Sequence, residues 1–156
     1  MNLNGEIERD NIKKIIPYED PFLFVDKVLS ISKDEIIATK KVLPSEEFLK
    51  GHFVGFPIMP GALTVEGMGQ AATLLARSNL INHQEKEILA YKLKEVRFMH
   101  PILPGDEIRY EISMIAMDER GAVCHGKTFV KDIFAAEAFF VIAIVNRADF
   151  RAKFSK

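Results

Sequence analysis

The sequence predicts an α+β domain in which one buried helix is covered by antiparallel strands. Two observations indicate this class: a long apolar segment of helical composition, Ala62–Asn79, and a run of four strand-like segments after it. Of the 156 residues 48% are hydrophobic and 28% charged, enough for a sizeable core without disulfides. Without repeats or linkers, we expect one domain over residues 1–156, with residues 1–14 as an N-terminal extension and residues 146–156 as a C-terminal tail.

Two extended segments are expected before the helix. Pro21–Val28 (PFLFVDKV) should be a short buried segment, and Ile31–Val42 (ISKDEIIATKKV) a strand, because both are rich in apolar or branched residues. The helix begins after Pro60-Gly61, and apolar residues on nearly every face predict that it is buried. Gly67 and Gly69 each weaken a helix by about 1 kcal/mol relative to alanine. We therefore expect them to make room for a neighbouring strand or a ligand.

Four strands are predicted after a polar break at residues 82–87. The segment Glu107–Met117 is the clearest, because apolar residues from Ile108 to Ala116 alternate with polar ones. Asp118–Gly121 is a suitable tight turn, so the last three strands should form a meander. Residues 131–134 predict a poorer turn, since no glycine supplies a positive φ angle there. The four predicted strands are Ile88–Phe98, Glu107–Met117, Ala122–Lys131 and Ala135–Val145.

Composition excludes several classes of protein. A net charge of −1 predicts no global attraction to nucleic acid or to an anionic membrane. The apolar stretch Ala138–Val145 is too short to span a bilayer, and the first 14 residues lack the apolar core of a signal peptide. Cys124 is the only cysteine, so no intramolecular disulfide forms and a cytoplasmic location is expected. The four histidines lack metal-ligand spacing, so no metal site is expected.

The stretch GHFVGFPIMPG at residues 51–61 is the first candidate site. Its apolar setting favours a neutral imidazole at His52, which is the form that accepts a proton. Gly55 and Gly61 let a ligand approach the backbone, and the Gly61 amide at the helix start is the best donor to a polarised carbonyl oxygen. The alternatives are a core histidine satisfied by hydrogen bonds and a merely structural Pro/Gly turn.

Glu66 is the second candidate. It is the only acid between Lys50 and Glu85 and lies about one turn into the apolar helix. A carboxyl sheltered from water has a raised pKa and can act as a general acid near neutral pH. The alternative is a first-turn glutamate that faces solvent or is stabilised by the helix dipole.

The motif GHFVGFPIMPGALTVEGMGQAA resembles the signature of the beta-hydroxyacyl-acyl carrier protein dehydratases, which combine a GHFPGxPIxPG loop with a helix carrying Glu-(Ala/Gly)-Met-Ala-Gln. Upstream, PFLFVDKVL is similar to the family's YPFLLVDRV. Downstream, VRFMHPILPGDEI is similar to its ARFxRPVxPGD. The resemblance runs from about Ile15 to Val145 in the family's order.

The resemblance implies a hot-dog fold, in which a curved antiparallel sheet wraps a long central helix. It also implies a homodimer, or a trimer of such dimers, with His52 from one chain and Glu66 from the other in a shared site. The implied reaction dehydrates a (3R)-3-hydroxyacyl-acyl carrier protein to the trans-2-enoyl form in fatty acid biosynthesis. His52 would be the base, Glu66 the acid, and Gly61 the donor to the enolate-like oxygen. No cofactor is implied beyond the phosphopantetheine of the carrier.

The resemblance also implies an acyl tunnel and a docking surface for an acidic acyl carrier protein. The expected tunnel residues are Phe53, Phe56, Ile58, Met59 and Phe98, which could equally be ordinary core. The expected basic patch consists of Lys92, Lys94 and Arg97, helped by Arg147, Arg151 and Lys153, although these residues could equally form a solvated edge.

Departures from the family pattern leave chain length and pathway open. Val54 and Met59 are similar to the dehydratase/isomerase branch, GHF(V/I)GDPVMPG. That branch carries an aspartate on the helix and a cysteine after the second Pro-Gly, where this chain has Glu66 and Ala62, so the plain dehydratase is favoured. Residues 18–20 read Tyr-Glu-Asp where the family has His-Arg-Tyr. An acyl thioesterase and a non-catalytic acyl-binding protein are the alternatives.

Overall fold

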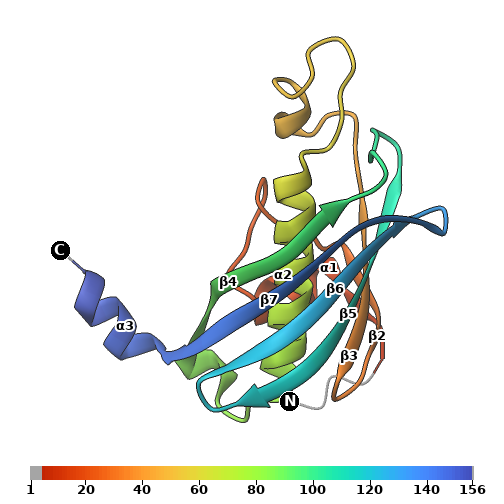
Figure 1. Cartoon of the computed structure of the whole chain (residues 1–156). Helices are drawn as coiled ribbons and strands as arrows, with labels where there is room; N and C mark the ends of the chain where they lie inside the picture. Colours follow the sequence, from red (N-terminus) through yellow and green to blue (C-terminus); the bar gives the residue numbers. More distant parts are fainter. Residues whose placement is uncertain (1–4, 156) are drawn as a thin grey trace.

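The structure is a computed structural model and describes residues 5–155. Within them, a seven-stranded antiparallel sheet curves around one long helix, α2 (Figure 1). The strands lie in the order β1-β2-β3-β5-β6-β7-β4, so β4 is an edge strand. The elements are β1 (Ile7–Glu8), α1 (Arg9–Ile15), β2 (Lys27–Ile31), β3 (Glu35–Lys41), the 3-10 turn η1 (Glu47–Leu49), α2 (Gly61–Ser78), the 3-10 turn η2 (His83–Glu85), β4 (Lys86–Phe98), β5 (Glu107–Asp118), β6 (Gly121–Val130), β7 (Ile133–Asn146) and α3 (Arg147–Phe154).

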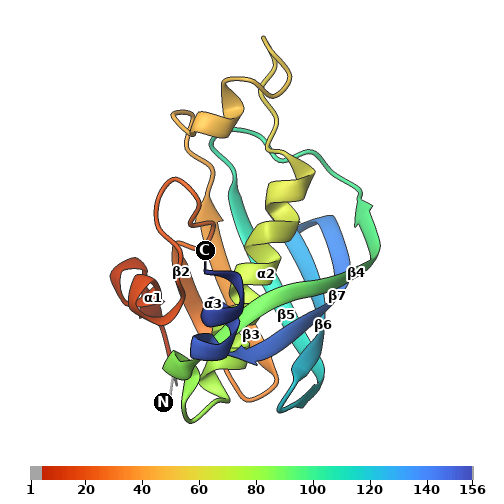
Figure 2. The ribbon, with the colours of Figure 1, turned by 90° about the vertical axis from the view of Figure 1, so that its left-hand side faces the viewer.

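Helix α2 confirms the predicted buried helix, with ends within one residue of the expected ones. It lies against the inner face of the sheet, as Figure 2 shows, and its residues from Gly67 to Arg77, except Gly69, are buried. Side chains on opposite sides of the helix, such as Ala72 and Leu74, are both fully inaccessible to water. The sheet therefore surrounds the helix instead of covering one stripe of it.

The two glycines inside α2 have different surroundings. A Cβ atom at Gly67 would lie 2.1 Å from the Tyr110 hydroxyl oxygen on β5, so this glycine makes room for a neighbouring strand, as predicted. A Cβ atom at Gly69 would meet nothing within 4 Å. The space beside Gly69 is open to a ligand or to another chain.

The meander of β5, β6 and β7 is confirmed, and Asp118 closes its first turn by accepting hydrogen bonds from the Arg120 and Gly121 amides at 2.8 and 3.1 Å. The remaining predicted strand, β4, crosses over to pair with β7 at the edge of the sheet. The alternation along β5 persists to Ile112. Beyond it, a β-bulge between Met114 and Ala116 interrupts the alternation.

Two details of the prediction are wrong. The turn after β6 needs no glycine, because Lys131 and Asp132 themselves adopt φ angles of 49° and 63° in a two-residue hairpin turn. The carboxylate of Asp132 accepts a hydrogen bond from Arg109 at 2.7 Å, which helps to hold this left-handed conformation. The segment Ile31–Val42 is not one strand: β2 ends at Ile31, a polar turn follows, and β3 begins at Glu35.

The ends of the described chain differ in how they join the body. Helix α1 packs into the common core through the buried Ile12 and Ile15. Helix α3 has no buried residue and extends away from the sheet (Figure 1). It is tied to β4 by Arg151, whose Nε donates to Glu87 at 2.9 Å, and Arg147 binds the same carboxylate. Within residues 5–155, none of the helices has the length and hydropathy needed to cross a bilayer.

Candidate active site

The loop between β3 and α2 projects beyond the end of the sheet (Figure 1) and carries His52. Its base is anchored by the buried Leu49 of η1 and by an ion pair of 2.7 Å between the buried Lys40 and Glu46. At its tip, Phe53 and Gly55 adopt φ angles of 56° and 85°, the left-handed region that favours glycine. The loop therefore bends sharply at its tip.

The orientation of the His52 ring is fixed by one hydrogen bond. Its Nδ1 lies 2.6 Å from the carbonyl oxygen of Ile58. Because a carbonyl oxygen only accepts, Nδ1 carries the proton in this contact. The lone pair is then on Nε2, and that atom is the one able to accept a proton from a ligand.

His52 lines a cavity of about 560 Å³ at the N-terminus of α2, together with Gly61 and Phe98. A Cβ atom at Gly61 would lie 2.7 Å from the Phe98 ring, so glycine at this position lets the ring approach the start of the helix closely. The Leu63 and Thr64 amides donate to the Pro60 carbonyl, and the Pro60 side chain makes no capping bond. The Gly61 amide precedes the first helical hydrogen bonds and has no acceptor within the helix.

Glu66 lines a second cavity, of about 160 Å³, between α2 and the inner face of β4 and β7. Burial in this mainly apolar space raises the pKa of the Glu66 carboxyl above its ordinary value, and a hydrogen bond from Gln70 opposes that shift. The cavity is lined by Tyr18, Ala62, Val65, Glu66, Gly69, Thr73, Ile88, Ala90, Leu93, Phe140 and Ile142.

Gln70 positions the Glu66 carboxyl. Its Nε2 donates to Glu66 Oε1 at 3.0 Å and to the Phe22 carbonyl at 2.8 Å, while its Oε1 accepts from the Phe24 amide at 2.8 Å. Sequence reasoning did not select this fully buried amide. The signal was available, because an uncharged polar residue one turn after Glu66 in an apolar helix must also find partners.

One chain does not bring His52 and Glu66 into the same cavity. The two cavities share only Ala62 among their lining residues. Of the predicted tunnel residues, Phe53, Ile58, Met59 and Phe98 line the His52 cavity. Phe56 lines neither cavity and is 64% exposed.

The predicted basic patch lies on β4. Lys92 and Lys94 are exposed, whereas the charge of Arg97 is matched by Glu137, whose Oε1 accepts from Arg97 Nε at 2.7 Å. The uncompensated positive charge of this patch is therefore that of the two lysines.

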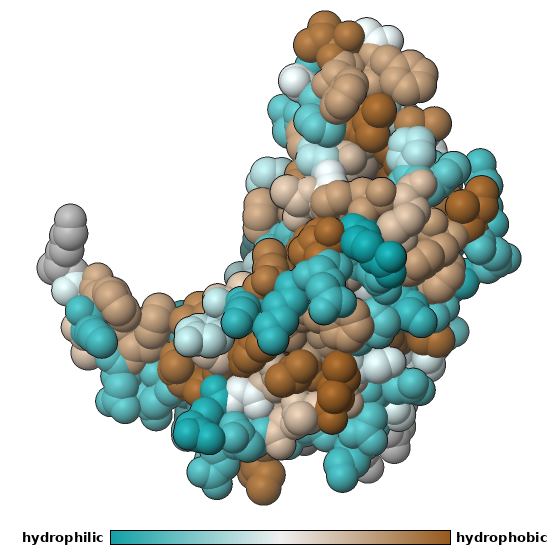
Figure 3. All heavy atoms as spheres, in the orientation of Figure 1, coloured by the Kyte–Doolittle hydropathy of each residue, from teal (hydrophilic) through white to brown (hydrophobic). Residues whose placement is uncertain are grey.

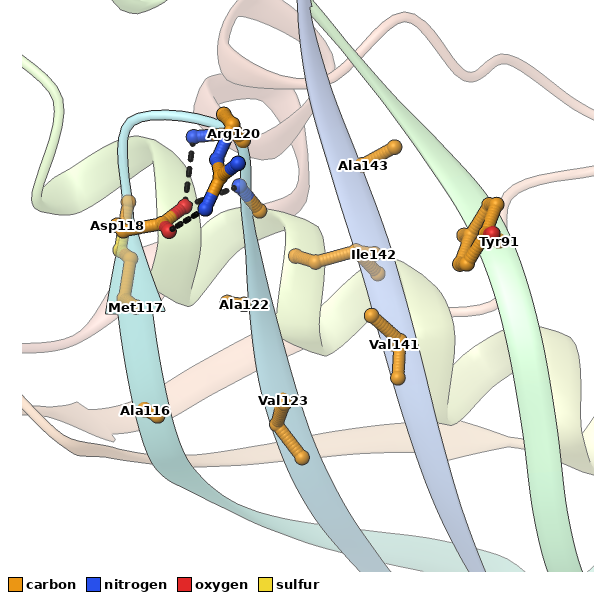
Figure 4. A pocket seen from close by; sticks show the side chains of 11 residues that line it. Tyr91, Ala116, Met117, Asp118, Arg120, Ala122, Val123, Val141, Ile142 and Ala143 are labelled. Atoms are coloured by element: carbon orange, nitrogen blue, oxygen red, sulfur yellow. Dashed lines mark hydrogen bonds and ion pairs between the residues drawn. The ribbon is translucent and has the colours of Figure 1, made fainter.

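A further cavity, of about 650 Å³, lies across β5, β6, β7 and β4 near the turn that joins β5 to β6 (Figure 4). Its charged groups, Asp118 and Arg120, bind each other at 3.3 Å. They leave no free acid or base there. Among the described residues, no three His, Cys, Asp or Glu side chains lie close enough together to hold a metal ion.

An antiparallel sheet wrapped around a buried helix, with a histidine loop at the helix N-terminus and a sheltered carboxyl one turn later, defines a hot-dog-fold protein with a candidate acid–base site. The sequence profile of the FabA-like domain matches residues 16–138. The chain belongs to this family.

Curated relatives agree with the assignment. The chain is 37% identical over 138 residues to a protein of Koribacter versatilis named 3-hydroxyacyl-[acyl-carrier-protein] dehydratase FabZ, covering 88% of each chain. It is 37% identical over 137 residues to a protein of the same name from Fusobacterium nucleatum, covering 86% of this chain and 95% of that relative.

Solved structures show the fold. The dehydratase heterocomplex ApeI:P from Xenorhabdus doucetiae contains a chain that superposes with a TM-score of 0.78 at 15% identity, covering 93% of this chain and 97% of that one. A hypothetical thioesterase with coenzyme A from Streptococcus pneumoniae superposes with a TM-score of 0.60 at 11% identity, covering 76% and 84%.

Proposed function

We propose that the protein dehydrates a 3-hydroxyacyl thioester carried by an acyl carrier protein, giving the trans-2-enoyl thioester in fatty acid biosynthesis. One observation carries the proposal: a candidate base and a candidate acid lie on α2 and the loop before it. The base is His52 on the loop, whose tautomer is set by the Ile58 carbonyl, and the acid is the desolvated carboxyl of Glu66 on the helix. The names of the curated relatives support the same reaction.

The elimination assigns one proton transfer to each side chain. Nε2 of His52 takes the C2 proton, and the C2–H electron pair forms the C2–C3 double bond. The C3–O bond breaks, its electrons stay on the oxygen, and Glu66 donates the proton that completes the departing water. The raised pKa of Glu66 favours the protonated form that this step needs. No electrons pass to another molecule, so the reaction requires no redox cofactor.

Backbone amides stabilise the negative charge that develops on the thioester oxygen. The Gly61 amide is the proposed donor, because it is free of helical hydrogen bonds and lies in the His52 cavity at the positive end of the α2 dipole. Gly55 supplies the bend that presents the loop. Its positive φ angle and the absence of any described atom within 4 Å of a Cβ built there fit that role.

We propose that two chains share each site, so that the His52 of one protomer meets the Glu66 of its partner. Strand β4 supports this arrangement: it pairs only with β7 among the described strands and leaves its other edge open. Leu93 of β4 lines the Glu66 cavity and yet is 54% exposed. The loop tip is apolar, and its brown side chains gather at the top of the surface view (Figure 3). A second copy that covers the open edge of β4 would seal the cavity and shield this loop tip from water.

The thioester arrives on the phosphopantetheine arm of the carrier, and Lys92 and Lys94 are the proposed docking charges for its acidic surface. Arg97, bound to Glu137, contributes less. A cytoplasmic location fits the buried free thiol of Cys124.

The purified protein with a 3-hydroxyacyl thioester should generate the absorbance of a conjugated enoyl thioester. His52→Ala and Glu66→Gln should each remove nearly all turnover. The matched controls His125→Ala, on the outer face of the sheet, and Glu47→Gln, at an exposed side chain of η1, should retain turnover. Release of free thiol without enoyl product would assign a thioesterase instead. Absence of either product would contradict catalysis on this substrate class.

A further inference from the structure

Tyr18 lines the Glu66 cavity but is neither the acid nor the base of the proposed reaction. It precedes the segment Pro21–Val28, in one of the positions where this chain departs from the family's pattern. Its side chain is half-buried and packs against the common core. A phenol and the Glu66 carboxyl therefore share the wall of one small, mainly apolar space.

The phenol is neutral and available. Burial, followed by the negative charge of Glu66, raises the pKa of Tyr18 above its ordinary value, and the positive charge of Arg77 opposes this shift only in part. Among the described residues, none forms a hydrogen bond with the Tyr18 hydroxyl. It can thus act as both donor and acceptor toward a molecule in the cavity.

The loop that carries Tyr18 is held on two sides. Arg9 and Lys13 of α1 bind the two acids that follow it: Arg9 pairs with Asp20, and Lys13 lies 3.1 Å from Glu19. On the other side, Gln70 donates to the Phe22 carbonyl at 2.8 Å. The same amide that holds the Glu66 carboxyl therefore also holds the Tyr18 loop, which fixes the two groups relative to each other.

The other polar groups of the cavity are occupied. The Thr73 hydroxyl donates to the Gly69 carbonyl at 2.9 Å, and Glu66 Oε1 accepts from Gln70. Glu66 Oε2 and the Tyr18 hydroxyl are left to bind a guest. The cavity of about 160 Å³ has the volume of only about five water molecules, so a polar atom bound to one of these groups lies near the other.

We propose that the Tyr18 hydroxyl hydrogen-bonds the 3-hydroxyl oxygen of the substrate, and then the departing water, beside the proton donor Glu66. This inference rests on the proposed function and adds a substrate-binding group to it. Tyr18 keeps its own proton throughout. Its part is to orient the leaving oxygen and to distinguish hydroxylated acyl chains from saturated ones.

The test compares Tyr18→Phe with the wild type on two ligands, the 3-hydroxyacyl thioester and the saturated acyl thioester of equal length. Dissociation constants are measured in a Glu66→Gln background, where no turnover occurs. Tyr18→Phe should weaken binding of the hydroxylated ligand about 3- to 10-fold, the worth of one neutral hydrogen bond, and leave the saturated ligand within about twofold. With Glu66 intact, it should lower kcat/KM by at least the same factor.

Two further variants separate this role from a structural one. Tyr18→His restores a donor and should recover most of the preference for the hydroxylated ligand, whereas Tyr91→Phe, at an exposed tyrosine of β4, should change nothing. If Tyr18→Phe weakens binding of both ligands equally, or of neither, the proposed role of Tyr18 is wrong. Turnover by the wild type would still support the dehydratase function in that case. A wild type that forms no enoyl product refutes the proposed function instead, and the two dissociation constants still decide whether Tyr18 recognises the hydroxyl.

Discussion

Replacing each of the two glycines inside α2 by alanine should have opposite effects on stability. At Gly67 the new methyl group would lie 2.1 Å from the Tyr110 hydroxyl oxygen and 2.4 Å from its Cζ. The ring is fully buried, and it has to move by about 1.3 Å or more against packed neighbours to reach an ordinary contact distance. At Gly69 the methyl group would enter open space.

The magnitudes follow from two opposing contributions. Alanine gains up to about 1 kcal/mol over glycine inside a helix, and overpacking a filled core costs about 1–3 kcal/mol or more. Because the new methyl group overlaps a buried ring, Gly67→Ala should lower the free energy of unfolding by about 2 kcal/mol net. Gly69→Ala, which lacks the clash, should raise the free energy of unfolding by about 0.4–1 kcal/mol. The two variants should therefore differ by about 2–3 kcal/mol.

Urea unfolding at one fixed protomer concentration measures the difference, because an oligomer's midpoint depends on concentration. Tyr110→Phe provides an internal check. The Tyr110 hydroxyl is buried without a partner among the described residues, so its removal costs little alone, and it should restore part of the stability lost in Gly67→Ala. Equal urea midpoints for Gly67→Ala and Gly69→Ala would refute the packing argument. Gly69→Ala should also lower turnover, since its methyl group enters the Glu66 cavity.

Three further outcomes are expected. Glu46→Gln leaves the buried Lys40 ammonium unpaired and should cost about 3 kcal/mol in urea unfolding, whereas the double variant Lys40→Met/Glu46→Leu should cost much less. Gln70→Leu removes the partner of the buried Phe24 amide and should cost about 2 kcal/mol by the same measurement. Burial raises the pKa of Cys124 to about 11, so its reaction with a disulfide reagent at pH 8 should accelerate at least about 100-fold in urea. Unchanged urea midpoints would contradict the proposed energies of the Lys40–Glu46 and Gln70–Phe24 contacts. A Cys124 thiol that reacts as fast in the native state as in urea would contradict its burial.

Local patterns predicted the elements that local forces determine. The composition of α2 and the alternation along β5 reflect burial of side chains a few residues apart, which any window of the sequence contains. The bulge after Met114 and the left-handed pair Lys131-Asp132 depend on partner strands, so the periodicity did not reveal them. Likewise, β4 pairs with β7, a contact between residues 38 to 60 positions apart that no local pattern encodes.

The candidate site follows the same division. His52 and Glu66 could be selected because each is a lone polar residue in an apolar stretch. Tyr18 and Gln70 were missed, since a tyrosine in a loop and an amide in a helix are common, and only the cavity shows their neighbours. His52 and Glu66 of one chain line different cavities, which is a property of the fold. The sequence predicted this separation only through the resemblance to enzymes whose sites are shared between two chains.

The central claim is that the base and the acid of each site come from different protomers, and mixing two inactive variants tests it most directly. Equal amounts of His52→Ala and Glu66→Gln are unfolded together, refolded and assayed for enoyl product. Random pairing makes about half of the dimers mixed, each with one intact site of two, so about a quarter of wild-type activity should return. If the mixture stays as inactive as either variant alone although mixed dimers are present, the site is not shared and the account is wrong.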